Sequence, residues 1–430
     1  MKALFQQLIT DFHEAKPKVV VERDYKVPLN SQKIISLIGV RRSGKTHLCY
    51  GLLNELRKTV DPHNLVYLNF EDDRLIDITL ADLDDLMEGY YTLYPTKRDE
   101  LVYLFLDEVQ NIPNWERYIR RIHDTLNVHI VVTGSSSRLL SKEIATCLRG
   151  RTLTYEIFPF SFTEYLRFHD IEINLNSSKS RSYIEHAFGN FLTQGGFAET
   201  FEQDADIQQR IWRDYLDLII YRDLIERYDI KNTHLLRHLI KYSFNNIGTL
   251  LSINKLYNEY KGLGHKISKD TLYQYFSYLE DAYALLSVPI FKNSIQEEQR
   301  QPRKIYAIDN GFKTLLNTSF SQDFSKLYEN LVFLELRRHQ REVYYYKGKQ
   351  EVDFYVPGPG ARLINVSVDI EDSKTFDREI NGLLEGMKYM KMDRAELVTQ
   401  HRDEQIEIEG KRIDVVPLWQ WLLVPCKMKS

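Results

Sequence analysis

The chain has 430 residues, of which 43% are hydrophobic and 27% are charged, and both fractions lie near the averages of globular proteins. Its length predicts two to four domains, at roughly 100–200 residues per domain. The net charge of −4 gives no overall attraction to nucleic acid, so any DNA contact requires a local basic face. The three cysteines lack metal-ligand or redox spacing, and no window reaches the roughly 20 apolar residues of a membrane span. We therefore expect a cytoplasmic protein without a membrane partner.

The first strongly patterned segment is a strand followed by a glycine-rich loop and a helix. Residues 33–38 are β-branched and apolar, as in a buried parallel strand, and residues 46–58 place leucines at helical spacing. Residues 39–46 between them match the pattern G-x-x-x-x-G-K-[ST], whose backbone N–H groups surround phosphate oxygens at the positive end of a helix. A chance glycine-rich turn is the alternative. The candidate nucleotide-binding residues are Gly39, Arg41, Arg42, Ser43, Gly44, Lys45, Thr46 and His47, with Lys45 at the β- and γ-phosphates and the Thr46 hydroxyl on Mg²⁺.

Two later strands end in polar residues that suit the same site. The apolar run 102–106 leads into Asp107 and Glu108, and we expect Asp107 to hold Mg²⁺ and Glu108 to polarise the attacking water. The run 129–134 leads into Ser135, a candidate sensor of the γ-phosphate, because open parallel sheets bind ligands at the carboxyl ends of their strands. A solvated loop after the acids and a plain turn at the serines are the alternatives.

These segments resemble the prokaryotic AAA-type ATPases that carry an uncharacterised C-terminal domain. The resemblance covers nearly the whole chain and implies an ATPase core that uses ATP and Mg²⁺, a winged-helix module, and a C-terminal fold similar to the PD-(D/E)xK nucleases. The stretches that carry it are residues 39–46, 106–110, 133–137, 148–151, 158–165, 195–199, 221–224, 309–311 and 328–332.

The same resemblance suggests a role for two arginines. In AAA-type rings an arginine reaches the γ-phosphate bound by a neighbouring subunit, which makes Arg149 and Arg151 candidates and a homo-oligomer a candidate assembly. A surface arginine paired with an acid is the alternative.

The order of elements predicts an α/β fold. Strands at 65–72 and 153–157 complete a doubly wound parallel sheet of the P-loop NTPase type. We expect an ATPase domain at 1–165, a helical lid at 166–235, a winged helix at 236–308 and an α/β nuclease-like domain at 309–430.

The winged helix is predicted from two short amphipathic helices, at 250–257 and 268–279, across a glycine-containing turn. Strands at 284–288 and 304–308 flank a polar stretch that suits a wing. One alternative is a protein-packing module with Tyr273, Tyr275 and Tyr278 in its core. The candidate DNA contacts are Lys266, Lys269, Tyr273, Gln274, Arg300, Arg303 and Lys304.

The C-terminal domain departs from the nuclease pattern. Such folds place acids and a lysine around a divalent metal, and Glu329 and Asp353 are the expected metal ligands. Asn365 and Ser367 stand where the pattern expects an acid and a lysine, and Lys374 lies off the strand. We therefore expect a folded, non-catalytic domain that binds a partner protein, with an ATP-regulated nuclease as the less favoured alternative.

Two classes of function stay open beyond ATP hydrolysis. One is a nucleic-acid-handling ATPase that acts through the winged helix. The other is a protein-binding switch of the signal-transducing ATPase kind.

Overall fold

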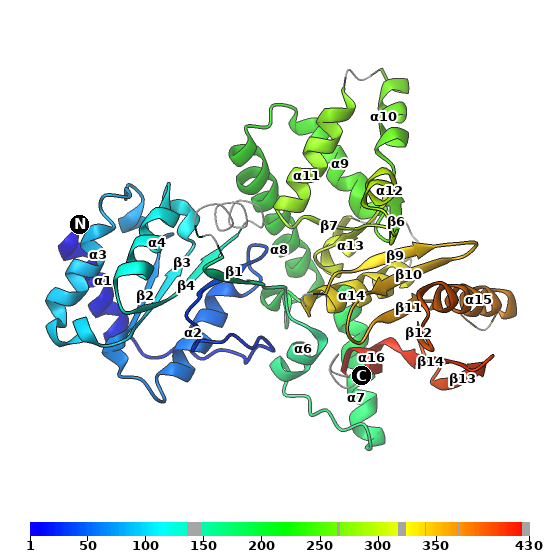
Figure 1. Cartoon of the computed structure of the whole chain (residues 1–430), viewed down its shortest axis with the longest axis horizontal. Coiled ribbons are helices and arrows are strands. Elements are labelled where there is room, and N and C mark those ends of the chain that lie inside the picture. Colours follow the sequence, from blue (N-terminus) through cyan, green and yellow to red (C-terminus); the bar gives the residue numbers. More distant parts are fainter. Residues whose placement is uncertain are drawn as a thin grey trace. The chain divides into compact units, whose positions relative to one another are not determined.

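The structure is a computed structural model that describes residues 1–135, 148, 150–264, 267–316, 324–339, 341–368, 370 and 372–423, and only the backbone of Arg300. The chain divides into two compact units, residues 1–158 and residues 159–430. Each unit is described by itself (Figure 1).

The first unit is built on a five-stranded sheet with the order β2-β3-β4-β1-β5, in which every neighbouring pair is parallel. The strands β1 and β4 are buried along their whole length, because both faces of a parallel sheet are covered by helices. This confirms the predicted α/β class and its parallel sheet. The strands are β1 (Ile34–Ile38), β2 (Leu65–Asn69), β3 (Val102–Asp107), β4 (Val128–Gly134) and β5 (Thr152–Glu156).

The helices of this unit pack apolar faces onto the sheet. In the helix from Trp115 to Thr125 the buried residues Trp115, Tyr118, Ile119 and Ile122 recur at helical spacing. The helix that precedes β1 in the chain packs beside β2 (Figure 1). The helices are α1 (Lys2–Glu14), α2 (Lys45–Leu56), α3 (Asp84–Leu93) and α4 (Trp115–Thr125), with 3₁₀ turns at Pro62–Asn64, Asp73–Leu75, Pro95–Asp99 and Val109–Asn111.

The second unit begins with helices and ends in a mixed sheet. Its first part holds α6 (Phe162–Phe168), α7 (Ser178–Gln194), α8 (Ala205–Leu218), a π-helix (Ile219–Glu226) and α9 (Thr233–Asn245). Its middle part holds β6 (Thr249–Leu251), α10 (Ile253–Gly262), α11 (Lys269–Asp281), β7 (Leu285–Val288), α12 (Ile295–Arg300), β8 (Arg303–Ala307) and α13 (Asn310–Leu316). Its last part holds α14 (Phe324–Arg338), β9 (Tyr344–Lys347), β10 (Glu351–Val356), β11 (Arg362–Val366), α15 (Ser373–Met390), β12 (Arg394–Thr399), β13 (Glu404–Ile408), β14 (Lys411–Pro417) and α16 (Leu418–Leu423).

The middle part has an antiparallel sheet of three strands with the order β6-β8-β7. Two helices, α10 and α11, lie between β6 and β7 in the chain, near the positions predicted for a helix-turn-helix. The start of the first predicted helix, at 250 and 251, belongs to β6 instead, and α10 begins at Ile253. The polar stretch predicted as a wing differs from that expectation. It contains the short helix α12, and Ile290 forms a bridge to Tyr345 of β9.

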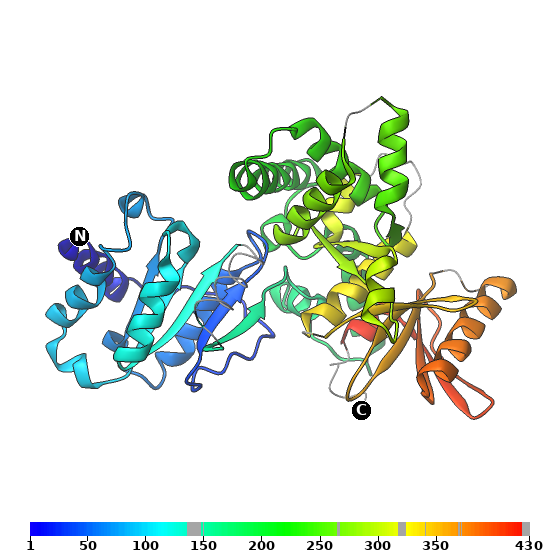
Figure 2. The same cartoon turned by 45° about the horizontal axis from the view of Figure 1, so that its top comes forward.

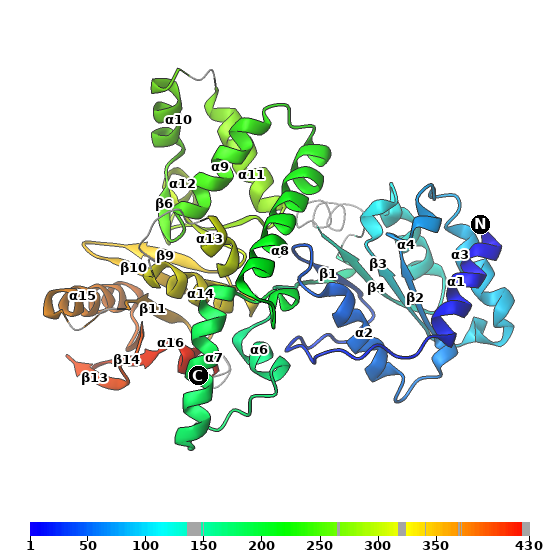
Figure 3. The same cartoon turned by 180° about the vertical axis from the view of Figure 1, so that it is seen from behind.

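The last part is a six-stranded sheet with the order β13-β14-β12-β11-β10-β9. The helix α15 lies along one face of it (Figure 2), where Leu383 and Met387 share a core with Val352 and Leu363. Phe354 of β10 instead approaches Phe333 of α14 at a ring distance of 6.4 Å. The helices α14 and α16 are seen beside the sheet from behind in Figure 3. The sheet is therefore covered by different helices on its two faces.

A buried aspartate joins three segments of the second unit. Asp309 accepts hydrogen bonds from the backbone N–H groups of Gly196 (2.6 Å) and Gly311 (2.7 Å). A Cβ atom on Gly195, whose φ is +78°, would lie 1.8 Å from the Asp309 carboxylate. A Cβ on Gly196 would lie 2.3 Å from the carbonyl oxygen of Phe160. A side chain at residue 195 would therefore meet Asp309, and one at residue 196 would meet the backbone of Phe160.

Burial raises the pKa of Asp309 to about 7, although the two backbone hydrogen bonds act to lower it. The unfolded chain, with an ordinary aspartate pKa, releases this proton between about pH 4 and 7 while the folded chain retains it. Stability from this group is therefore present at about pH 4 and is lost as the pH rises to about 7.

We expect the urea midpoint of the wild type to fall across this pH range more than that of Asp309→Asn, which cannot ionise. The free energy of unfolding that the wild type loses over this range, beyond any loss in the variant, is at most about 4 kcal/mol. Because Asp309→Asn also loses a hydrogen bond, the comparison uses only the change with pH. Equal pH dependence in the two proteins would contradict the burial argument.

Candidate functional site

The glycine-rich loop after β1 has the backbone that the sequence pattern requires. Gly39 has a φ of +154°, and a Cβ there would lie 2.2 Å from the carbonyl oxygen of Ile157. Gly44, which begins α2, has a φ of +92°, and a Cβ there would lie 2.7 Å from the Arg23 guanidinium. Among the described residues no side chain caps α2. Its first N–H groups and the positive end of its dipole therefore face the loop.

Lys45 is held inside this loop. Its side chain is 4% exposed, and its ammonium group donates to the carbonyl oxygens of Gly39 (3.1 Å) and Val40 (3.0 Å). It also lies 3.8 Å from a carboxylate oxygen of Glu108. The structure thus brings together the lysine and the acid that the sequence assigned to one site.

Asp107, at the end of β3, is 1% exposed and accepts hydrogen bonds from three hydroxyl groups. Its Oδ2 atom accepts from Thr46 Oγ1 (2.6 Å) and from Tyr67 OH (2.8 Å). Its Oδ1 atom accepts from Thr133 Oγ1. The carboxylate of Asp107 in β3 therefore links the start of α2 with β2 and β4, and Thr46 and Asp107 lie together as their predicted metal role requires.

Glu108 lies just beyond the strand in a left-handed conformation, with a φ of +55°. Its backbone N–H group donates to Thr133 Oγ1 (3.0 Å), and its carboxylate accepts a hydrogen bond from Gln110. Residues other than glycine rarely adopt this backbone conformation, and those that do are often found at functional sites. Here the turn places the Glu108 carboxylate toward Lys45.

Two buried hydroxyl groups test whether the loop suits a phosphate group. Ser43 is 2% exposed and Ser135 is 1% exposed, and neither Oγ atom has a hydrogen-bond partner in the described part of the chain. A buried polar group without a partner is costly, so such groups call for a ligand, an ion or water. Ser43 in the loop and Ser135 at the end of β4 fit a nucleotide phosphate at the carboxyl ends of the strands.

The other predicted loop residues lie nearer the surface. Arg41 pairs with Glu71 at 3.2 Å. Arg42 is exposed and has a φ of +65°, so it supplies a turn of the loop. His47 is exposed on α2, and its ring lies edge-on to Tyr50 at 6.4 Å.

The two arginines predicted to reach a neighbouring subunit have different outcomes. Arg149 lies outside the described residues. Arg151 pairs with Asp124 of α4, with distances of 3.0 Å from Nε and 3.3 Å from Nη2. This contact matches the alternative of a surface arginine paired with an acid, while a role between subunits stays a prediction for either arginine.

Sequence reasoning missed Thr133 and Tyr67, the two strand residues that complete the hydrogen bonds of Asp107. Thr133 lies at the same end of β4 as Ser135. The polar residues at this strand end therefore signalled a site, but the sequence analysis attributed the role to Ser135 alone. Tyr67 carried no separate signal, because aromatic residues in strands usually belong to the core.

The C-terminal part contains a second set of predicted residues, and a lysine lies at its centre. Lys304 of β8 is 2% exposed, and its ammonium nitrogen lies 3.1 Å from Glu329, 2.9 Å from Glu351 and 2.8 Å from Asp353. Tyr306 donates to Glu329 at 2.7 Å. We call Glu329, Glu351, Asp353 and Lys304 the lysine cluster.

The position of Lys304 corrects one expectation. The sequence analysis predicted that Lys304 lies near DNA phosphates, and this prediction is wrong. A side chain that is 2% exposed and paired with carboxylates cannot reach a nucleic acid. Burial lowers the pKa of Lys304, but the carboxylates of Asp353 and Glu329 outweigh it and raise the pKa well above its ordinary value. Lys304 is therefore charged inside the cluster.

Two neighbouring lysines balance the charge of the lysine cluster. Glu329 also pairs with Lys326 (3.1 Å), and Glu351 with Lys347 (3.6 Å). Three carboxylates thus face three lysines, which leaves no net negative charge to attract a divalent cation. Within the described residues, no group of three or more His, Cys, Asp or Glu side chains is placed to hold a metal ion.

The residues that replace the nuclease pattern have structural contacts. Asn365 accepts from the backbone N–H of Asp353 (2.9 Å) and donates to Glu379 of α15 (2.7 Å). Ser367 donates its backbone N–H to the carbonyl oxygen of Val398 (2.9 Å). Lys374 is exposed at the start of α15. The cation near Asp353 therefore comes from Lys304, which the sequence had assigned elsewhere.

Comparison with known proteins adds the family. A model of an AAA domain matches residues 31–166, and models of two domains of unknown function match residues 185–323 and 324–421. An uncharacterized protein of Methanocaldococcus jannaschii is 37% identical over 98% of this chain and 96% of its own length. The chain belongs to a prokaryotic family of AAA-type ATPases. A second uncharacterized relative, from Haemophilus influenzae, is 28% identical over 91% of this chain and 94% of its own length.

Two solved structures are more distant neighbours. The Walker-type ATPase of Pyrococcus abyssi is similar over 71% of this chain and 99% of its own, with 16% identity and a TM-score of 0.42. The ORC1 protein of Aeropyrum pernix, solved in complex with DNA, is similar over 73% of this chain and 90% of its own, with 13% identity and a TM-score of 0.29.

None of the helices in the described parts of this AAA-type ATPase combines the length and the apolar character that crossing a bilayer requires.

We expect Lys304→Met to lower the free energy of unfolding by about 3–5 kcal/mol, because it leaves buried carboxylates without their cation. The control is Lys326→Met, which removes a 28% exposed lysine from the same Glu329 and costs about 1 kcal/mol or less. Urea unfolding measures both.

The loss in Lys304→Met also depends on pH. Because Lys304 acts to lower the pKa values of Glu329 and Asp353, its loss raises both pKa values in the folded state. The variant therefore loses stability as the pH rises from about 5 to 8, relative to the wild type. Equal costs for the two lysine variants, or a cost that shrinks as the pH rises, would contradict the arrangement.

Proposed function

We propose that this protein binds ATP with Mg²⁺ and hydrolyses it at the loop between β1 and α2. The observation that carries the proposal is that Lys45, Thr46, Asp107 and Glu108 meet beside two buried hydroxyl groups that have no hydrogen-bond partner among the described residues. The match of an AAA domain to residues 31–166 supports nucleotide binding.

The residues divide the reaction between them. Lys45 and the first N–H groups of α2 bind phosphate oxygens, and Thr46 and Asp107 hold the metal. A Mg²⁺ ion held there would supply positive charge to stabilise the negative charge that develops on the transferred phosphoryl group. Glu108 orients the attacking water and accepts its proton, and Ser135 contacts the γ-phosphate or that water.

We expect Lys45→Ala to weaken ATP binding by at least about tenfold, since it removes a charged hydrogen bond to phosphate. Glu108→Gln should bind ATP normally and hydrolyse it about 100-fold more slowly or worse, because a general base acts only on the water. Nucleotide binding and single-turnover hydrolysis separate the two effects.

Matched control residues lie on α2, the helix of Lys45, and just after its end. Glu55 and Lys58 form an exposed ion pair, so Glu55→Gln and Lys58→Ala repeat the same chemical changes away from the loop. Both controls should keep wild-type binding and turnover. Near-normal turnover in Glu108→Gln would remove this residue from the role of base.

We propose further that the middle part of the second unit is a winged helix that contacts nucleic acid. The support is a partly exposed basic and aromatic surface. Lys269 at the start of α11 and Arg303 at the start of β8 are exposed, and Tyr273 on α11 is 56% exposed. Lys266 lies outside the described residues, and Gln274 donates to Tyr278 on the helix itself.

The alternative is a protein-directed switch, and part of the tyrosine pattern favours it. Tyr275 is 7% exposed, and Tyr278 stacks on Tyr228 with ring centroids 3.7 Å apart. These two rings serve packing, whereas Tyr273 does not. The ATPase rate with and without single-stranded and duplex DNA separates the two functions, because only the first predicts stimulation.

If Lys269 and Arg303 neutralise phosphates, the variant Lys269→Ala with Arg303→Ala should bind duplex DNA more weakly for every sequence. The slope of log affinity against log salt should become shallower by about two units, at about 0.9 per phosphate contact. Lys231→Ala with Arg394→Ala is the control, since it removes two exposed cations elsewhere in the unit. An unchanged slope in the first variant would favour the protein-directed switch.

For the C-terminal part we propose a non-catalytic, nuclease-like domain that takes part in partner binding. The charge balance of the lysine cluster supports this, because phosphodiester cleavage of this type needs a metal-bound water.

A further inference from the structure

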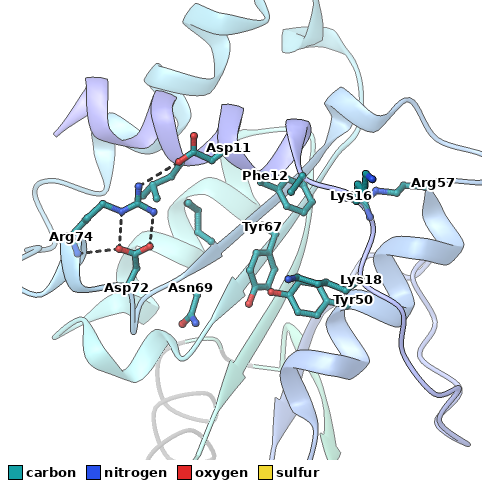
Figure 4. A pocket seen from close by; sticks show the side chains of 13 residues that line it. Asp11, Phe12, Lys16, Lys18, Tyr50, Arg57, Tyr67, Asn69, Asp72 and Arg74 are labelled. Carbon is teal, nitrogen blue, oxygen red and sulfur yellow. Dashed lines mark hydrogen bonds and ion pairs between the residues drawn. The ribbon is translucent and has the colours of Figure 1, made fainter.

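A cavity of about 230 Å³ lies in the first unit between α1, α2 and β2 (Figure 4). It opens beside the carboxyl end of β2, whereas the nucleotide loop follows β1. The strands β3 and β4 separate β2 from β1 in the sheet. No residue of the loop at 39–46 lines the cavity.

Aromatic rings form one wall of this cavity. The Tyr50 and Tyr67 rings lie 5.0 Å apart, and Phe12 lies 5.9 Å from Tyr67. The Arg57 guanidinium lies over Phe12 at 5.2 Å. Figure 4 shows these rings from three different elements turned toward the same space. Such a wall offers stacking and edge contacts to a planar ligand.

The charges at the cavity are uneven. At one end Arg74 is neutralised by Asp72 (2.8 Å) and Asp11 (3.4 Å). At the other end lie Lys16, Lys18 and Arg57, and none of the three forms an ion pair with another described residue. Among the described residues, the Arg57 guanidinium donates only to the Asn54 side chain (3.1 Å). This cationic end is complementary to an anionic group.

One side chain connects the cavity to Asp107, the predicted metal residue. The Tyr67 ring lines it, and the Tyr67 hydroxyl donates to Asp107 Oδ2 at 2.8 Å. Because Asp107 accepts from Thr46 at the same oxygen, a shift of Tyr67 changes the hydrogen bonds of the predicted metal residues.

We propose that this cavity binds a small aromatic anion, namely a planar ring that carries one phosphate or carboxylate group, and that the bound ligand alters ATP hydrolysis through Tyr67. The volume suits one substituted ring, since pockets for larger, drug-sized ligands hold about 300–1,000 Å³. The binding step stands by itself, whereas the effect on hydrolysis rests on the proposed ATPase function.

The probe is phenyl phosphate, with benzoate to separate phosphate from carboxylate, and with inorganic phosphate and phenol to test each half of the ligand. Titration by protein-detected NMR or calorimetry should show saturable binding of phenyl phosphate or benzoate below about 10 mM. Inorganic phosphate and phenol should each bind at least about tenfold more weakly, since each makes only half of the contacts.

Variants locate the binding. Arg57→Gln should weaken phenyl phosphate binding about tenfold, because it removes a charged partner of the anion, while the matched control Lys58→Gln, one residue away and paired with Glu55, should not. Lys45→Ala should leave phenyl phosphate binding unchanged, which separates this cavity from the nucleotide loop. Tyr67→Phe should still bind the probe, but the bound probe should no longer alter ATP hydrolysis in this variant.

Several outcomes would overturn the proposal. These are no saturable binding of either aromatic anion, equal affinity in Arg57→Gln and Lys58→Gln, equal affinity for inorganic phosphate, or loss of binding in Lys45→Ala. If the probe binds as expected but the protein hydrolyses no ATP, the cavity stands and the proposed ATPase function fails.

Discussion

The first unit depends on the way one buried carboxylate is satisfied. A buried charge is tolerated only when it is paired or fully hydrogen-bonded, and Asp107 meets this condition through three hydroxyl groups. Those hydroxyls belong to α2, β2 and β4, while Asp107 itself belongs to β3. The strand order explains why this works, because β3 lies between β2 and β4 and can be reached from both. The predicted metal residues are thereby held by the sheet itself.

In the second unit, buried polar networks link segments that are distant in the sequence. Asn310 donates to the carbonyl oxygens of Leu192 (2.8 Å) and Leu327 (3.2 Å), and Asn330 donates to Asn310 (2.9 Å). Asn330 also accepts from the backbone N–H of Ala307 (2.9 Å). Together with the contacts of Asp309, these bonds unite the stretches around 195, 309 and 330. These three stretches are among those that carry the resemblance to the AAA-type ATPase family, and in this protein they have a structural role.

The sequence predicted the glycine-rich loop and the five strands of the first unit well because their signals are local. A buried parallel strand is a continuous apolar run, and the loop pattern has a fixed spacing. Tyr67 and Thr133 were missed because their roles depend on strand register. Asn69 of β2 lies opposite Asp107, and Val132 of β4 lies opposite the preceding residue, so both hydroxyls come within reach only in the assembled sheet.

Lys304 shows the same limit more strongly. Its local pattern suggested a strand beside a wing, while its partners lie 25 to 49 residues further along the chain. The pairing of β9 with β10 shifts register between Val352 and Tyr355, and both of these residues belong to the core beneath α15. Asp353, between them, is directed to Lys304 instead. An irregularity of this kind re-aims a side chain, and strict alternation along a strand cannot predict it.

The lysine cluster and the site at the glycine-rich loop both contain buried acids, but they differ in whether their buried polar groups all have partners. This difference indicates different chemistry at the two sites. In the lysine cluster each carboxylate has an ammonium partner, so the arrangement is complete without a ligand. Around the glycine-rich loop the buried hydroxyls of Ser43 and Ser135 lack partners among the described residues. Because unpaired buried polar groups cost free energy, they mark a place where a ligand can improve the interactions. A nucleotide phosphate can do so at the end of the parallel sheet, whereas a metal ion entering the lysine cluster would first have to displace Lys304.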